Sequence, residues 1–329
     1  MAYLSELQIA LAAVREAAEL CGEVQQQMDP GAIQKKDRSP VTVADFGSQA
    51  LICSRLRKAF PDDPIIAEET SATLRSEEAG ATTDRIVGHV RMLRPEASRE
   101  DVLSWIDLGN HKAHAPRYWT LDPIDGTKGF LRGDQYAVAL ALIVDAKVVV
   151  AAVACPNLTL EGYPEHRGVV AGAIRGQGTT LYRLQDMEPM GKICVSETKD
   201  PALSRFSESV ESTHTSHSQS ALISRLLGIK RPATRLDSQA KYVVVAAGDA
   251  DIYLRLPSDR RYIENIWDHA AGMLLVEEAG GRVTDTRGMD LDFGYGYQLL
   301  ENRGILVTNG HVHRMMLRAI ADIAPEDQS

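Results

Sequence analysis

The hydrophobic positions of the first sixty residues recur at helical spacing. Between residues 3 and 28 they fall three or four positions apart, which predicts one amphipathic helix. Residues 44–60 predict a second helix, which the sequence PDDP at 61–64 ends. Extended segments are predicted on either side of this second helix, at 39–43 and 65–67.

Apolar runs without strict alternation dominate the middle of the chain. The strands that they predict are 119–121, 137–144, 148–155, 168–174 and 179–182. Only residues 145–147 separate the two longest runs, so this pair predicts a β-hairpin. By contrast, residues 70–117 are polar and irregular, and one helix at 97–108 is the only element predicted there.

Helical and extended patterns alternate in the last third of the chain. The predicted helices are 218–227, 242–247, 267–279 and 312–323, and the predicted strands are 252–256, 282–284 and 305–308. The segment 196–220 is rich in Ser, Thr, Glu and His and is the predicted junction between two domains, 1–195 and 196–329. Antiparallel strands followed by alternating elements predict an α+β half and then an α/β half.

Composition and charge narrow the class of protein. Apolar residues make up 44% of the 329 residues and charged residues 25%, which excludes a disordered, collagen-like or coiled-coil chain. The formal net charge is −9 without a long Lys/Arg run, so neither a nucleic acid nor an anionic membrane is expected as the main partner. The four cysteines are widely spaced and form no CxxC pair, which predicts reduced thiols in a cytosolic setting.

The distribution of apolar residues also bears on location. The beginning of the chain predicts an amphipathic helix instead of a signal peptide. The longest apolar run, 137–144, is too short to span a bilayer. We therefore expect a soluble, cytoplasmic protein.

Residues 122–127 (DPIDGT) directly follow a predicted buried strand. Asp122 and Asp125 lie three positions apart on a turn, and carboxylates that converge there would repel each other without a cation between them. Hard oxygen ligands of this kind suit magnesium. If a helix begins at Thr127, the N–H groups of Gly126 and Thr127 would also face an anion. A tight turn with a side-chain cap would explain the same residues without a ligand.

Four further acids are candidates only in combination. Glu68 and Glu69 follow the predicted strand at 65–67, where acids commonly mark a solvated strand end. Asp45 and Asp268 stand at the heads of predicted helices, where a carboxylate commonly caps the helix or complements its dipole. None of these acids identifies a site by itself.

Together, these segments resemble the lithium-sensitive, magnesium-dependent phosphatases of the inositol monophosphatase superfamily. The resemblance rests on WTLDPIDGTKGF at 119–130 and WDHAAG at 267–272, and it extends over nearly the whole chain. Within the superfamily the chain is similar to the 3′(2′),5′-bisphosphate nucleotidases of fungi and plants. The segments that carry this closer likeness are 39–45, 122–132, 236–242 and 253–257. The resemblance implies a layered αβαβα architecture, with an antiparallel sheet in the N-terminal half and a mixed sheet in the C-terminal half.

The resemblance also implies a site for two or three magnesium ions. Glu68, Asp122 and the carbonyl of Ile124 would hold the first ion, and Asp122, Asp125 and Asp268 the second. Most of these ligands lie in the domain predicted at 1–195, while Asp268 lies in the other. With Asp45, such a pocket would hold about five negative charges, which cannot all stay ionised cheaply without divalent cations.

Catalytic roles follow from the same likeness. Asp45 and Glu68 would border a weaker third ion, and Thr127, with Asp45 behind it, would orient and deprotonate the attacking water. No cysteine lies in the motif, so direct attack by water is expected instead of a covalent phosphoenzyme. One departure from relatives is Ala67, which stands before Glu68 where a glycine is common.

A substrate with two phosphates needs a second anion site. Lys241 can supply a point charge and Arg255 a planar fork for phosphate oxygens. The substrate-binding set that the resemblance implies is Gly126, Thr127, His214, Ser238, Lys241, Arg255 and Asp268. His217 could replace His214, because both lie in one hydrophilic stretch.

The expected activity is removal of the 3′-phosphate from adenosine 3′,5′-bisphosphate to give AMP and phosphate. Expected alongside it are a second substrate, 3′-phosphoadenosine 5′-phosphosulfate, a role in sulfur assimilation, inhibition by lithium, and a monomer or weak homo-oligomer. An inositol phosphate phosphatase is the nearest alternative. A sensor that binds nucleotide or metal without turnover is the alternative from another class.

Overall fold

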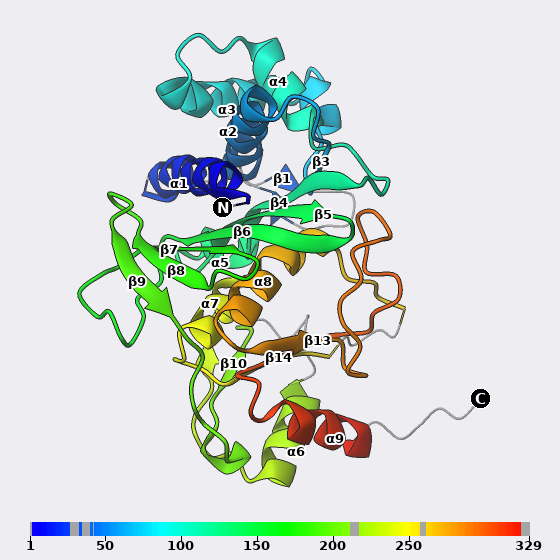
Figure 1. Ribbon diagram of the computed structural model, residues 1–329. Coiled ribbons are helices and arrows are strands. Elements are labelled where there is room, and N and C mark those ends of the chain that lie inside the picture. Colours follow the sequence, from blue (N-terminus) through cyan, green and yellow to red (C-terminus); the bar gives the residue numbers. More distant parts are fainter. Residues whose placement is uncertain are drawn as a thin grey trace.

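Helices and sheets alternate in five layers (Figure 1). The computed structural model describes residues 2–26, 33–34, 40–41, 43–210, 217–256 and 261–323. The layered αβαβα architecture predicted from the sequence is confirmed.

The first layer is helical and covers one face of the larger sheet. It contains α1 (Leu4–Gln26), α2 (Val43–Ala59), α3 (Gly80–Leu93) and α4 (Arg99–Asp107). The apolar stripe of α1 packs into the core formed with α2 and the sheet. The short strands β1 (Ile33–Gln34) and β2 (Pro40–Val41) pair antiparallel between α1 and α2 along the chain.

The prediction of a single helix in residues 70–117 was incomplete. A 3₁₀ turn, η1 (Ser71–Arg75), and α3 precede α4. The sequence of α3 contains two glycines and two threonines, and its N-cap, Ala79, makes no side-chain capping bond. Its formation therefore owes little to local propensity and much to the burial of residues such as Ile86 and Val90. The start of α4, in contrast, has a complete capping box.

The second layer is a seven-stranded sheet whose strands follow one another in chain order. Its strands are β3 (Ile65–Ala67), β4 (Arg117–Asp125), β5 (Ala137–Val144), β6 (Lys147–Cys155), β7 (Val169–Ile174), β8 (Thr179–Arg183) and β9 (Pro189–Ile193). All neighbouring pairs are antiparallel except β3–β4, which is parallel. The prediction of an antiparallel sheet was therefore wrong at this edge, because the helices between β3 and β4 return the chain to the same end of the sheet. Both faces are buried, which explains why the strands read as continuous apolar runs.

The remaining layers come from the C-terminal part of the chain. Two helices, α7 (Ala240–Ala246) and α8 (Ala270–Glu278), lie between the large sheet and a mixed five-stranded sheet. The strands of this smaller sheet are β10 (Phe206–Glu208), β11 (Thr234–Arg235), β12 (Ile252–Arg255), β13 (Arg282–Thr284) and β14 (Ile305–Thr308). Its other face packs on α6 (His217–Leu227) and α9 (His313–Ile323).

The chain passes from the large sheet to the small sheet between β9 and β10, near the predicted domain junction. Two domains divided at residues 195 and 196 nevertheless stay a prediction, because one continuous apolar core joins the two sheets through α7 and α8. The strands β10 and β11 are only three and two residues long, which explains why no sequence pattern predicted them.

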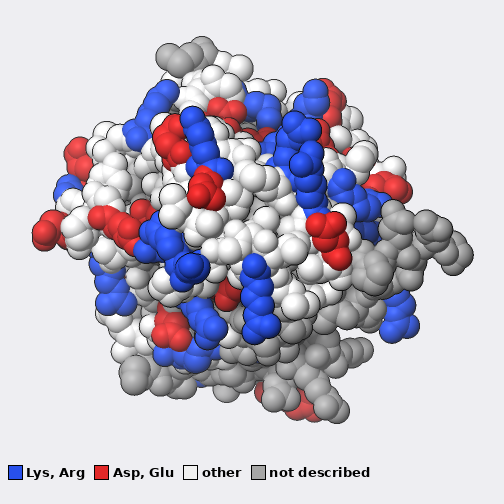
Figure 2. Space-filling model, turned by 90° about the horizontal axis from the view of Figure 1, so that it is seen from below, with Lys and Arg blue, Asp and Glu red and all other residues white. Residues whose placement is uncertain are grey.

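The surface is mixed in charge on the face that carries α6 and α9. In Figure 2, Lys and Arg side chains stand among Asp, Glu and uncharged residues. Among the described residues, no helix combines the length and apolarity needed to cross a membrane. All four cysteines lie in described segments and are unpaired; Cys21, Cys53 and Cys155 are buried and Cys194 is exposed.

Candidate active site

The parallel pairing of β3 with β4 sets two acids side by side. Ala67 is aligned with Leu121, so the residues that follow them, Glu68 and Asp122, emerge at the same edge of the sheet. Glu68 is half-buried, and Asp122 is only 2% exposed. The register of a buried strand pair therefore positions the first two carboxylates.

A β-bulge at the end of β4 brings a third carboxylate to the same side. Residues three apart in a regular strand point to opposite faces. Here Asp122 is paired with Ala139 and Asp125 with Ala137, so three steps on β4 oppose two on β5. The extra residue allows Asp122 and Asp125 to share one face.

The turn after the bulge has a geometry that requires glycine. Gly126 has a φ of +88°, and a Cβ there would lie 3.1 Å from the Cβ of Ser238. The predicted helix begins directly after it as α5 (Thr127–Leu131), which is five residues long. The Thr127 hydroxyl donates a hydrogen bond of 3.2 Å to the carbonyl of Ile124.

Two more acids arrive from segments far apart in the sequence. Asp45 lies in the first turn of α2 and is 2% exposed. Asp268 ends a 3₁₀ turn, η3 (Ile266–Asp268), instead of lying inside the predicted helix at 267–279. His269 occupies the N-cap position of α8, so Asp268 is not the cap of that helix.

These five carboxylates form one electrostatic cluster. Burial raises the pKa of Asp122 well above its ordinary value, and the charges of Glu68, Asp125, Asp268 and Asp45 raise it further. Burial also raises the pKa values of Asp125 and Asp268, to which the charge of Glu68 adds. The structure thus brings together all five predicted acids; their roles as metal ligands stay predictions.

Two cations adjoin the acids, the buried Lys241 and the partly buried Arg255. Lys241 lies in α7, and burial lowers its pKa to about 8 although Asp125 acts in the opposite direction. Arg255 ends β12, with its Nη2 atom 3.9 Å from Oδ2 of Asp268. Both cations lower the pKa of Asp125 against the effect of burial.

The remaining substrate residues predicted from the sequence have different outcomes. Ser238 is buried, has a φ of +72° and lies next to Gly126. His214 lies outside the described residues, and so does the side chain of His217. Their assignment to the nucleotide site stays a prediction.

Gln239 is a site residue that sequence reasoning missed. Its backbone N–H donates to Oδ2 of Asp125 at 2.6 Å. Its side-chain amide donates to the carbonyl of Trp267 at 2.9 Å and accepts from the N–H of Gly272 at 2.9 Å. One residue therefore links the turn that carries Asp125 to the segment that carries Asp268. Its position in the string LDSQAKY at 236–242 was the only available signal.

Replacing Gln239 with Leu is expected to lower the free energy of unfolding by about 2–4 kcal/mol. The substitution would leave two buried backbone groups, the carbonyl of Trp267 and the N–H of Gly272, without their hydrogen-bond partner. Urea unfolding measures this loss, and the exposed Gln185 supplies a matched Gln-to-Leu control that should change stability by less than about 0.5 kcal/mol. Equal effects at both positions would show that Gln239 does not join the two segments.

Lys112 is a second site residue that sequence reasoning missed. It lies in the polar, irregular segment 70–117. Its ammonium lies 3.4 Å from the carbonyl of Ala67 and 5.4 Å from the ring centroids of Trp267 and Tyr297. Burial lowers its pKa, while Glu68 and Glu69 oppose that effect. Lys112 therefore connects the end of β3 with the segment that leads to Asp268.

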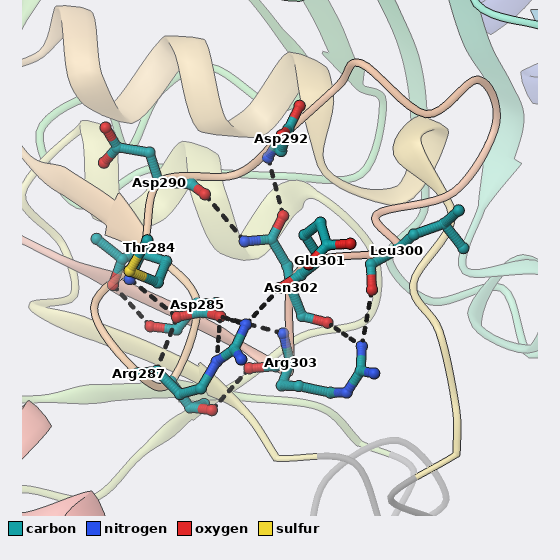
Figure 3. A network of polar contacts seen from close by, with 11 residues as sticks. Thr284, Asp285, Arg287, Asp290, Asp292, Leu300, Glu301, Asn302 and Arg303 are labelled. Atoms are coloured by element: carbon teal, nitrogen blue, oxygen red, sulfur yellow. Dashed lines mark hydrogen bonds and ion pairs between the residues drawn. The ribbon is translucent and has the colours of Figure 1, made fainter.

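A network of polar contacts fixes the loop at 285–303, which also contacts the segment that leads to Asp268 (Figure 3). The fully buried carboxylate of Asp285 accepts hydrogen bonds from three nitrogens of Arg287 and from the backbone N–H groups of Met289 and Arg303. Farther along, the carbonyl of Tyr297 accepts from the N–H of Ile266 at 3.1 Å. The loop is thus fixed at its base and holds the residues just before Asp268.

The layered fold and the acid cluster define the class of protein. The sequence model of the inositol monophosphatase family matches residues 3–325. The chain belongs to the inositol monophosphatase family.

Curated relatives narrow the comparison. The chain is 42% identical to a 3′(2′),5′-bisphosphate nucleotidase of Schizosaccharomyces pombe, with 99% of this chain and 98% of the relative covered. It is also 42% identical to a 3′(2′),5′-bisphosphate nucleotidase of Oryza sativa, with 98% and 96% covered.

Solved structures support the fold. The extragenic suppressor protein suhB of Bartonella henselae superposes with a TM-score of 0.67 at 20% identity, covering 97% of this chain and 100% of that one. An IMPase of Thermotoga maritima superposes with a TM-score of 0.65 at 22% identity, covering 97% and 98%.

Proposed function

We propose that this chain is a magnesium-dependent phosphohydrolase that removes the 3′-phosphate from adenosine 3′,5′-bisphosphate and releases AMP and phosphate. The observation that carries the proposal is the position of two cations, Lys241 and Arg255, beside Asp125 and Asp268 of the acid cluster. The names of the relatives, which are near full-length matches, support the same substrate class.

The donor set of the acid cluster fits magnesium. All side-chain donors are carboxylates, and their mutual repulsion favours a cation among them. Glu68, Asp122 and the Ile124 carbonyl would hold one ion, and Asp122, Asp125 and Asp268 a second. When bound, magnesium would lower the pKa of water and neutralise phosphoryl oxygens.

Thr127 and Asp45 would prepare the nucleophile. The Thr127 hydroxyl donates to the carbonyl of Ile124 in this structure. In the proposed reaction it turns toward Asp45, donates its hydrogen to that carboxylate, and accepts a hydrogen bond from the attacking water. Asp45, whose carboxylate is buried, would then take up the proton as the general base.

Lys241 and Arg255 would bind the phosphate that is not cleaved. Lys241 is buried and only 14% of the Arg255 side chain is exposed, so their interaction with a phosphate is little screened by water. Ser238, which lies next to Gly126, would add a hydroxyl to this site. A monophosphate cannot use both parts of the site, so a bisphosphate is the favoured substrate.

A hollow of about 400 Å³ beside this site offers room for the nucleoside. Leu236 and Asp237 line it from the segment that precedes Ser238, and Arg167 and Arg235 also contribute. Val210 lines it too. This arrangement supports a nucleotide over a smaller sugar phosphate.

Several finer expectations belong to the same proposal. They are activity on 3′-phosphoadenosine 5′-phosphosulfate, inhibition by lithium, a role in sulfur assimilation, a cytoplasmic location, and a monomer or weak homo-oligomer. Two or three magnesium ions per site and the absence of nucleic-acid binding are further parts of it.

A phosphate-release assay tests the proposed activity. The substrates are adenosine 3′,5′-bisphosphate, adenosine 3′-monophosphate and inositol 1-phosphate, each with and without magnesium and lithium. We expect release to require magnesium, to be inhibited by lithium, and to show the highest kcat/KM for the bisphosphate. A preference for inositol 1-phosphate would contradict the substrate, and calorimetric binding of the bisphosphate without release would indicate a sensor.

A further inference from the structure

A buried series of hydrogen-bonded side chains contacts Arg255. The Oε2 atom of Glu264 is 2.9 Å from Nη2 of Arg255 and 3.1 Å from Nε2 of His269. Nδ1 of His269 is in turn 2.8 Å from the hydroxyl of Tyr242. The side chain of Glu264 is 3% exposed and that of His269 is fully buried. The contacts therefore run from Tyr242 through His269 and Glu264 to Arg255.

Arg255 stands between two carboxylates. Its Nη2 atom is 2.9 Å from Glu264 but 3.9 Å from Asp268. The Glu264 carboxylate therefore holds the guanidinium at the distance of a close ion pair, while the contact with Asp268 is longer. Without Glu264, Asp268 would be the remaining close carboxylate for the partly buried guanidinium, and a charge that is poorly solvated strongly favours a partner.

We propose that Glu264 is a positioning residue with two effects. It orients the guanidinium of Arg255 toward the second phosphate of the substrate, and it prevents Arg255 from forming a close ion pair with Asp268. The inference rests on the proposed function, because it takes Asp268 as a metal ligand and Arg255 as a phosphate ligand. His269 and Tyr242 fix the Glu264 carboxylate in place. The second-phosphate site and the metal site are thus coupled through one guanidinium.

The same cluster is less suited to an additional metal ion. Ligand atoms of Glu264, Asp268 and His269 lie within 4.8 Å of one another. Arg255 already supplies a positive charge to two of these residues at 2.9 and 3.9 Å. A guanidinium in this position would repel a cation.

Glu264→Gln tests the proposal, because it removes the charge while keeping the size of the side chain. Two quantities are measured: the magnesium dissociation constant by calorimetry without substrate, and the ratio of kcat/KM for adenosine 3′,5′-bisphosphate to that for adenosine 3′-monophosphate. We expect the magnesium affinity to fall by about tenfold, as is common for groups that orient metal ligands. The substrate ratio should also fall by about tenfold.

The double variant Glu264→Gln/Arg255→Met distinguishes pairing of Arg255 with Asp268 from a nonspecific structural effect of the Glu264 substitution. Without the guanidinium, Arg255 can no longer form an ion pair with Asp268, so magnesium affinity should return to that of Arg255→Met alone. The substrate ratio should stay low. A merely structural role of Glu264 predicts no such recovery, and its absence would overturn the proposal, as would wild-type affinity and ratio in Glu264→Gln.

Two comparisons make the result unambiguous. If Arg255→Met leaves the substrate ratio unchanged, the proposed second-phosphate site is wrong; if only Glu264→Gln leaves it unchanged, the positioning role is wrong. Glu16 lies on α1 and pairs with Arg55 of α2 and with Arg94 at the end of α3, so Glu16→Gln is a matched loss of an ion-paired carboxylate that should leave magnesium affinity unchanged. If Glu264→Gln does not fold, Tyr242→Phe removes only the far hydroxyl and should shift both quantities in the same direction by a smaller factor. Wild-type values in Tyr242→Phe would then contradict the proposal.

Discussion

Replacing Asp122 with Asn is expected to lower kcat/KM by about three orders of magnitude and yet to stabilise the metal-free protein. Asp122 is the one carboxylate assigned to both magnesium ions, so its loss removes charge that holds each of them. A thousandfold loss corresponds to about 4 kcal/mol of transition-state stabilisation. Magnesium should also cease to raise the melting temperature, since a ligand that no longer binds gives no stabilisation.

The gain in stability follows from the sign of the pKa shift. Burial and neighbouring acids raise the pKa of Asp122 in the folded state, so the folded protein binds this proton more tightly than the unfolded chain does. Stability of the metal-free protein should therefore fall as pH rises from the ordinary carboxyl pKa through the raised one. Asn carries no charge at any pH, so Asp122→Asn should gain on the order of 1 kcal/mol at neutral pH and show a weaker dependence on pH.

Asp285 provides a matched control for this experiment. It is as buried as Asp122, but its carboxylate accepts hydrogen bonds from Arg287, Met289 and Arg303. Asp285→Asn should therefore lower the melting temperature, the opposite of Asp122→Asn. Destabilisation by Asp122→Asn without magnesium would show that the acid cluster is not under electrostatic strain.

Replacing Arg255 or Lys241 with Met is expected to reduce kcat/KM for adenosine 3′,5′-bisphosphate by about 10- to 100-fold. The reason is the loss of a charge-assisted hydrogen bond to the second phosphate, which contributes about 1.5–3 kcal/mol. Hydrolysis of adenosine 3′-monophosphate should change far less, because it lacks that phosphate. Steady-state kinetics on both substrates measures the difference.

Arg282 supplies the control for this substitution. It lies at the start of β13 and pairs with Asp290, outside the acid cluster. Arg282→Met should leave both substrates unaffected. Equal losses on the two substrates in Arg255→Met and Lys241→Met would refute the assignment of these cations to a second phosphate.

Elements with a clear period or a sharp boundary were predictable from the sequence. The apolar stripe of α1 needs only its own spacing to be recognised, and β5 and β6 are continuous apolar runs separated by two residues in the structure. Even the DPIDGT turn can be interpreted locally, because its proline and glycine restrict the backbone. Motif resemblance added the identities of the distant acids.

Other features depended on contacts that no local pattern encodes. The helix α3 has weak propensity and forms because residues such as Ile86 are buried. Gln239 looks like an ordinary polar residue in the sequence, yet in the folded chain it joins the Asp125 turn to Gly272. The contact of Glu264 with Arg255 is equally invisible, because it joins a loop to the end of β12.

The sequence by itself determined where most helices and strands form and which kinds of side chain are available for chemistry, since these follow from hydrophobic periodicity and from residue type. The layered arrangement of these elements was implied by the resemblance to a known family. Only the tertiary structure decided how closely the acids and cations approach. The strand register puts Glu68 beside Asp122, and a bulge brings Asp125 to the same face. Buried packing between the two sheets then brings the segment that carries Asp268 to them. Charges interact strongly only over short, poorly solvated distances, so the function of this cluster could be assessed only once the chain was folded.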